Sequence, residues 1–121
     1  MKKLSTAMLE GADRRPQASL GFFRSRSFVI TSCAMGAAYE SVCGHPDDAH
    51  ADLVSMASMA AVRGAFPNVD WDTITPNPAF VAVFPNEATP TQTLYDVIAQ
   101  LNDHYHWTRE RIATWLQGMG Y

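Results

Sequence analysis

The most regular pattern of hydrophobic and polar positions lies at the C-terminal end and predicts two consecutive amphipathic helices. Apolar side chains three or four positions apart fall on one face of a helix. They recur at Leu94, Val97, Ile98, Leu101 and Tyr105 in the first helix, and at Ile112, Trp115, Leu116 and Met119 in the second. A polar turn at 104–106 joins them into an αα-hairpin, which we expect to pack on a helix over 32–43.

Polar residues mark the starts of both helices. Thr89, followed by Pro90 and Gln92, has the sequence of a capping box with proline in the first turn. Thr108 stands at the same place before the second helix, and the apolar Trp107 before it can staple onto the following turn. We therefore expect the two helices to begin after Thr89 and after Thr108.

Three further helices are predicted upstream. The first covers 6–12 with Ser5 as its cap and buries Leu4, Ala7, Met8 and Gly11. The second covers 32–43 with Ser32 as its cap and Gly44 just past its end. Its run of small residues lets another backbone approach closely, so we expect it to be the central buried helix. The third begins near 47 or 48 and ends near 63, with an apolar face made of Leu53, Met56, Ala57, Ala60 and Ala61.

Two β-favouring runs, 20–23 and 28–31, flank a short polar link and predict a hairpin. A lone hairpin is marginal in water, so we expect it to pack on the helices or to pair with a third strand over 80–84. Residues 64–79 are predicted to be irregular and anchored by Trp71 and Ile74. The predicted fold class is therefore mainly α (α+β), with four to five short helices and a small hairpin or three-stranded sheet.

The length of 121 residues and the 47% hydrophobic content fit one compact domain over 1–121. No stretch approaches the ~20 apolar residues that cross a bilayer. Two cysteines are too few for a disulfide scaffold and fit a reduced, cytoplasmic setting. The net charge of −3 argues against a protein whose whole surface grips nucleic acid.

The charge is unevenly distributed along the chain. Residues 1–30 hold six basic and two acidic side chains, whereas 40–72 hold six acidic and one basic. Such polarity can steer an acidic partner to one face. The alternative is that the two regions lie side by side and partly neutralise each other.

Candidate chemistry is sparse. Cys43, His45 and His50 do not follow the recurrent ligand spacings of zinc sites, so no metal is predicted. Cys33, at the start of a helix, would be an activated nucleophile if it were exposed, but its small apolar neighbours favour burial. No glycine-rich phosphate loop is present, and we predict no catalytic residue and no cofactor.

The candidate binding residues are cationic. Two arginines at the start of the last helix stand where a recognition helix reads bases, next to the histidines of the preceding turn. Near the N-terminus, two arginines follow a pair of phenylalanines, an interleaving typical of single-strand binders. The candidates are Arg24, Arg26, His104, His106, Arg109 and Arg111.

Three blocks of the sequence resemble small uncharacterised bacterial and phage-encoded proteins. They are Leu-x-x-Ala-Met at 4–8, Ser-Cys-Ala-Met-Gly-Ala-Ala at 32–38, and the block from Leu101 to Leu116 that contains Leu-Asn-Asp and Trp-Thr-Arg-Glu. The resemblance implies no activity. It implies that the three blocks belong to one domain and that residues 44–88 are where such proteins would differ.

Together these patterns favour a non-enzymatic cytoplasmic binding or adaptor protein that contacts another protein or a second copy of itself, with no membrane contact. One alternative is a nucleic-acid-binding regulator that uses the N-terminal basic region and the C-terminal helix pair. The other is a small enzyme that uses Cys33 or a histidine.

Overall fold

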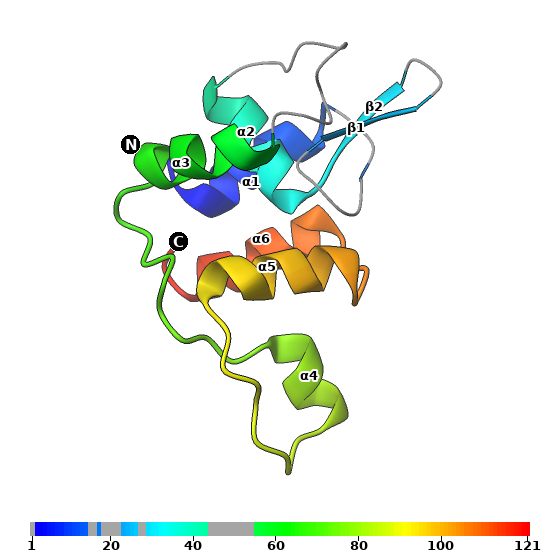
Figure 1. Cartoon of the computed structure of the whole chain (residues 1–121), viewed down its shortest axis with the longest axis vertical. Helices are drawn as coiled ribbons and strands as arrows, with labels where there is room; N and C mark the ends of the chain where they lie inside the picture. Colours follow the sequence, from blue (N-terminus) through cyan, green and yellow to red (C-terminus); the bar gives the residue numbers. More distant parts are fainter. Residues whose placement is uncertain (1, 15–16, 18–22, 27–28, 44–54) are drawn as a thin grey trace.

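The computed structural model describes residues 2–14, 17, 23–26, 29–43 and 55–121, and for 23–26, 29–32, 43 and 55–59 only the backbone. Its fold is mainly helical, as predicted (Figure 1). The elements of the described residues are α1 (Leu4–Ala12), β1 (Phe23–Arg26), β2 (Val29–Ser32), α2 (Ala34–Cys43), α3 (Ser55–Ala65), α4 (Pro78–Val83), α5 (Leu94–Asp103) and α6 (Arg109–Gly118).

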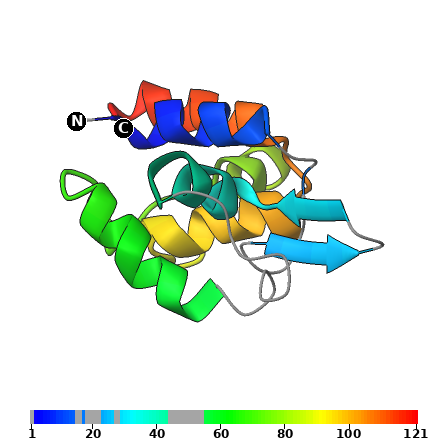
Figure 2. The same cartoon turned by 90° about the horizontal axis from the view of Figure 1, so that it is seen from above.

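Helix α2 is the centre of the arrangement. It contacts α1, α3, α5 and α6, and Figure 2 shows it between the α1–α6 pair and the other two helices. Ala34, Ala37 and Ala38 are completely buried. On α1, a Cβ atom added to Gly11 would lie 1.8 Å from the carbonyl oxygen of Ala37, so the two backbones touch. The predicted central position of this helix is confirmed, and small residues on both helices explain the close approach.

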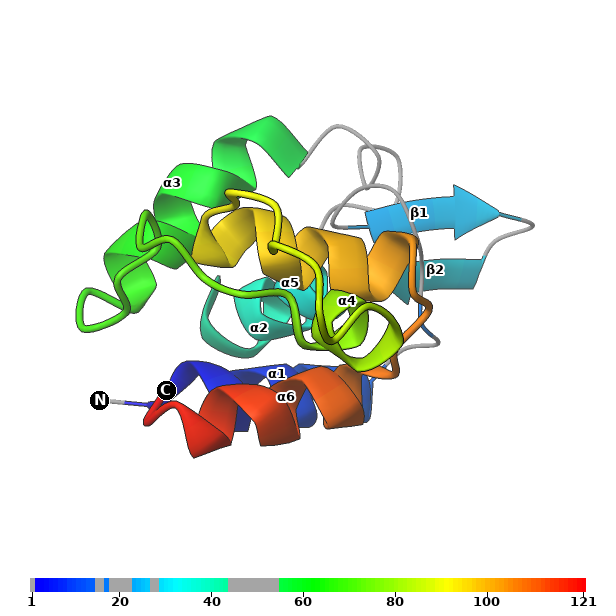
Figure 3. The same ribbon diagram turned by 90° about the horizontal axis from the view of Figure 1, so that it is seen from below.

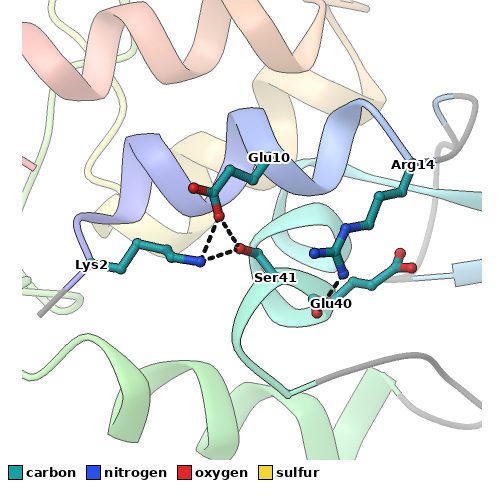
Figure 4. Close-up of polar contacts among 5 residues, drawn as sticks. All are labelled: Lys2, Glu10, Arg14, Glu40 and Ser41. Atoms are coloured by element: carbon teal, nitrogen blue, oxygen red, sulfur yellow. Dashed lines mark hydrogen bonds and ion pairs between the residues drawn. The ribbon is translucent and has the colours of Figure 1, made fainter.

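Polar contacts join the outer edge of the same helix pair (Figure 4). Lys2 forms an ion pair with Glu10 and donates to Ser41 Oγ at 2.9 Å, while Ser41 Oγ donates to Glu10 at 2.9 Å. The hydrogen bonds from Lys2 and Ser41 lower the pKa of Glu10. Arg14 Nη1 donates to the carbonyl of Glu40 at 3.4 Å. These side chains connect α1 to α2, so we assign them a structural role.

Helices α1 and α6 run antiparallel, side by side (Figure 3). At one end the amide and hydroxyl of Ser5 donate to the carbonyl of Tyr121, at 3.1 and 2.9 Å. At the other end Arg109 Nη2 donates to the carbonyl of Ala12 at 3.2 Å. The two C-terminal helices were expected to pack together on α2; α5 contacts α2, but α6 lies chiefly along α1.

The ends of three helices differ from the sequence prediction. Helix α5 is capped by Thr93, whose Oγ1 accepts from the amide of Asp96, and Thr89 is not its cap. Residues 89–92 are not helical, and a β-bridge pairs Thr93 with Ile74 directly before the helix begins. Helix α1 begins at Leu4 with Lys3 at the cap position, so Ser5 is not its cap. Helix α2 begins two residues after Ser32, the last residue of β2.

The free backbone amides at the start of α2 donate hydrogen bonds to the adjacent Cys33 and to a residue from a distant part of the chain. The sulfur of Cys33 accepts from the amide of Gly36 at 3.3 Å. Asn102 Oδ1, on α5, accepts from the amide of Ala34 at 3.1 Å and from Gln17 Nε2 at 3.0 Å. The Cys33 sulfur and a buried amide side chain from α5 therefore together replace the serine cap that we predicted.

The predicted buried face is correct for α1 and, from Leu94 to Leu101, for α5; Tyr105 lies beyond the end of α5 and is half-buried. For α6 the predicted face is partly correct. Thr108 caps α6 as predicted, accepting from the amide of Arg111. Ile112 and Leu116 are buried, but Met119 is 38% exposed and Trp115 only half-buried. Arg109 and Ala113 are buried instead, because the face that meets α1 is rotated from the predicted one.

The predicted strand over 80–84 is wrong. Asn77 Oδ1 accepts from the amides of Ala79 and Phe80, and Pro78 occupies the first position of α4. The cap and proline thus start a helix before the β-favouring residues. Strands β1 and β2 pair antiparallel, with Phe23 opposite Ser32 and Arg26 opposite Val29. The predicted packing of a hairpin on the helices stays a prediction, because the side chains of both strands lie outside the described residues.

The face predicted for α3 is also wrong where it can be compared. Ala60 and Ala61 are exposed, while Val62 and Phe66 enter the core. The predicted start of this helix, and Leu53, lie outside the described residues. Trp71 is buried and anchors the following loop as expected. The backbone of Ile74 pairs with Thr93, but its side chain is 62% exposed and does not anchor the loop to the core as predicted.

Candidate functional site

A groove of about 430 Å³ lies between α4 and the turn that joins α5 to α6. Figure 1 shows α4 on the far side of the α5–α6 pair from α2 and α3. One wall is aliphatic and comes from α4; the other is aromatic and cationic and comes from the turn. The lining residues are Pro78, Ala79, Ala82, Val83, Tyr105, His106, Trp107, Thr108 and Arg111.

The turn presents its side chains through an unusual backbone. His106 has a φ of 54°, in the left-handed region that non-glycine residues seldom adopt. The amide of Trp107 donates to the carbonyl of Leu101 at 2.8 Å, which fixes the turn against the end of α5. The His104 and Tyr105 rings meet edge to face, 4.9 Å apart. Strained residues of this kind concentrate at binding sites, where surrounding structure holds them.

Arg111 and Trp107 form a stacked pair at the groove. The guanidinium carbon of Arg111 lies 3.8 Å from the centre of the Trp107 ring, within the range of a cation–π contact. Trp107 is half-buried, whereas Arg111 is exposed in the first turn of α6. This contact holds the positive charge of Arg111 against the Trp107 ring at the lining of the groove.

The α4 wall exposes apolar side chains. Val83, in the groove lining, is 63% exposed. Phe84, directly after α4 and outside the groove lining, is 44% exposed, and its ring packs 5.1 Å from that of Phe80. All residues of 81–91 are exposed. Exposed apolar surface next to a concave site is typical of a binding surface. The sequence interpretation missed this wall because it assigned 80–84 to a strand; Asn77-Pro78 was the signal that could have found the helix.

The structure brings together part of the predicted contact set. His106 and Arg111 line the groove and His104 flanks it. Arg109 lies inside the α1–α6 contact, where burial lowers the pKa of its guanidinium. Arg24 and Arg26 lie on β1, away from this turn in the chain, and their side chains are outside the described residues.

Cys33 borders a small cavity of about 60 Å³, lined also by Tyr95, Asn102 and Asp103 among others. Burial raises the pKa of its thiol to about 11, and this effect outweighs the Gly36 amide, which favours the thiolate. The thiolate is the nucleophilic form of cysteine. A thiol held neutral in this way argues against the enzyme alternative that used Cys33.

No group of three or more His, Cys, Asp or Glu side chains in the described part of the chain has an arrangement that could hold a metal ion. His45, His50 and the side chain of Cys43 lie outside that part. Within the described ranges, no helix combines the length and apolar character that crossing a bilayer requires.

The chain matches no protein-family model, no curated protein sequence and no solved structure. The resemblance to small bacterial and phage-encoded proteins therefore stays a prediction. Its three blocks fall on α1, on α2 with the end of β2, and on α5–α6. Those helices contact one another around α2, which gives the blocks a common structural role.

Proposed function

We propose that this chain is a non-enzymatic, cytoplasmic binding or adaptor protein that contacts a protein partner through the groove between α4 and the α5–α6 turn. The observation that carries the proposal is the α4 wall of the groove, where Val83 remains exposed opposite the aromatic turn and Arg111 of α6. Apolar surface of this kind is stabilised when a partner covers it.

The rest of the molecule supports a binding role over a catalytic one. The Cys33 thiol is held neutral and buried, and the carboxylate of Glu10 is engaged by Lys2 and Ser41 in the α1–α2 contact. A reaction needs a nucleophile, a base and a stabiliser around one solvent-reached point. The groove offers apolar contact and a fixed cation, which are the means of recognition.

The test compares two exposed aliphatic positions. Val83, in the groove, and Ile74, outside it, are 63% and 62% exposed. We would place photoreactive p-benzoylphenylalanine at each position in turn and irradiate the protein in its native cell. We expect a defined protein adduct from position 83 and little or none from position 74. An adduct with a second copy of the chain would identify self-association as the form of binding.

Equal adducts from both positions, or none from position 83 with the variant folded and expressed, would contradict the proposal. Far-ultraviolet circular dichroism of each variant provides the folding check.

A further inference from the structure

The chemistry of the groove narrows the class of partner. Arg111 contributes a positive charge to its lining. Among the described residues, no carboxylate lies within ion-pair distance of the Arg111 guanidinium, whereas the exposed Arg63 is paired with Asp72 at 3.1 Å. The Arg111 guanidinium at the groove therefore contacts the ring of Trp107 and forms no ion pair with a described carboxylate.

Stacking leaves the hydrogen-bonding edge of a guanidinium open. The N–H groups of arginine lie in the plane of the guanidinium and point outward from its carbon, the atom that lies over the Trp107 ring. A carboxylate fits this planar fork with two parallel hydrogen bonds. The stack also orients the side chain before binding, which reduces the entropy lost when a partner docks.

The α4 wall of the groove offers an apolar surface. Ala82 and Val83 present small aliphatic groups, and the ring of Tyr105 contributes from the turn. Such a surface accepts a hydrophobic side chain. It offers no group that would neutralise a second charge.

We propose that the partner presents a short peptide segment in which an aspartate or glutamate carboxylate binds Arg111 while a neighbouring aliphatic or aromatic side chain packs against Val83 and Ala82. The inference rests on the proposed protein-binding function and makes Arg111 the residue that determines specificity.

A nucleic acid fits these walls less well than a peptide does. Binding of a phosphate backbone depends on several cations along its path. Here one wall is aliphatic and Arg109 is buried, so Arg111 is the only lysine or arginine among the described residues that line the groove. The observations favour a partner with one carboxylate and apolar side chains.

The test begins with a phage-displayed library of random short peptides selected on the immobilised full chain. A selected peptide is then synthesised with a fluorescent label, together with a second version in which each acidic residue is replaced by its amide. We expect the amide version to bind the wild-type chain about tenfold more weakly, the scale of one lost charge-assisted hydrogen bond. Arg111→Met should weaken the acidic peptide by the same factor and leave the amide peptide unaffected.

Two further variants and one competitor separate the outcomes. Lys3→Met removes an exposed cation outside the groove and should leave binding unchanged. Val83→Asp should weaken both peptides, which locates them at the groove. A single-stranded oligothymidylate is the nucleic-acid competitor.

If the selected peptides no longer bind Val83→Asp but bind Arg111→Met as tightly as wild type, the carboxylate inference is overturned and the protein-binding proposal remains intact. If oligothymidylate displaces the peptide from the wild-type chain and does not bind Arg111→Met, the carboxylate inference is overturned in favour of nucleic acid. Failure to select any peptide sensitive to Val83→Asp would count against both proposals.

Discussion

At the scale of single residues, burial determines the chemistry of two side chains that the sequence marked as candidates. Cys33 and Arg109 both lie at helix starts. There, an exposed cysteine would be an activated nucleophile and an exposed arginine would face a binding partner. Both are buried instead, and burial disfavours the charged form of each. Arg111, two positions beyond Arg109, remains exposed.

The raised pKa of Cys33 predicts a pH dependence of stability. The thiol ionises near pH 9 in the unfolded chain and near pH 11 in the folded protein. The stability that the neutral thiol gives the folded state is thus complete below pH 9 and is lost as the pH rises towards 11, because only the unfolded state releases the proton between these pH values. Urea unfolding should show wild type losing about 1.4 kcal/mol more than Cys33→Ala between pH 7 and pH 10. Parallel pH profiles of the two proteins would contradict a buried, neutral thiol.

At the scale of elements, the start of α5 depends on Thr93. Its side chain accepts from the amide of Asp96, while Thr89 lies in an exposed segment. Thr93→Ala should lower the free energy of unfolding by about 1 kcal/mol, the usual effect of losing a helix cap. Thr89→Ala is the matched control and should change it by less than about 0.5 kcal/mol. Chemical denaturation measures both, and a larger loss from Thr89→Ala would restore the cap predicted from the sequence.

The contact between α1 and α2 depends on the absence of a side chain at Gly11. A Cβ there would meet the backbone of Ala37, which cannot move aside as a flexible side chain can. Gly11→Ala should therefore destabilise the protein by about 3 kcal/mol, at the upper end of overpacking effects. Gly64→Ala, on α3, meets nothing within 4 Å and should stabilise it by up to about 1 kcal/mol through helix propensity. Thermal unfolding of the two alanine variants checks the opposite signs.

At the scale of the whole molecule, the helices around α2 form the core and α4 lies outside it. Val97, Ile98 and Leu101 of α5 are completely buried, whereas α4 buries Ala79 alone. The segment that carries α4 is held at its base by the Ile74–Thr93 bridge and by Asn77. This arrangement places one groove wall on an element with few core contacts.

Native-state hydrogen exchange should report this difference. The amides of Val81 and Phe84 are bonded within α4, to the carbonyls of Asn77 and Phe80. They should exchange at least ~100-fold faster than those of Ile98 and Leu101, because local opening of α4 leaves the core intact. Equal protection at both sites would mean that α4 unfolds only with the whole molecule. A peptide that binds the groove should slow exchange in α4 specifically.

The sequence alone determined the helical class, the buried faces of α1 and α5, and the central place of the small-residue helix. Each of these follows from the periodicity of side chains about one helix axis, which is a local property. The tertiary structure decided the start of α5, the helical state of 78–83 and the burial of Arg109. These depend on the bridge from Ile74, the Asn77 cap and the packing of α6 on α1. The groove was not predictable because its walls come from segments whose approach local periodicity does not encode.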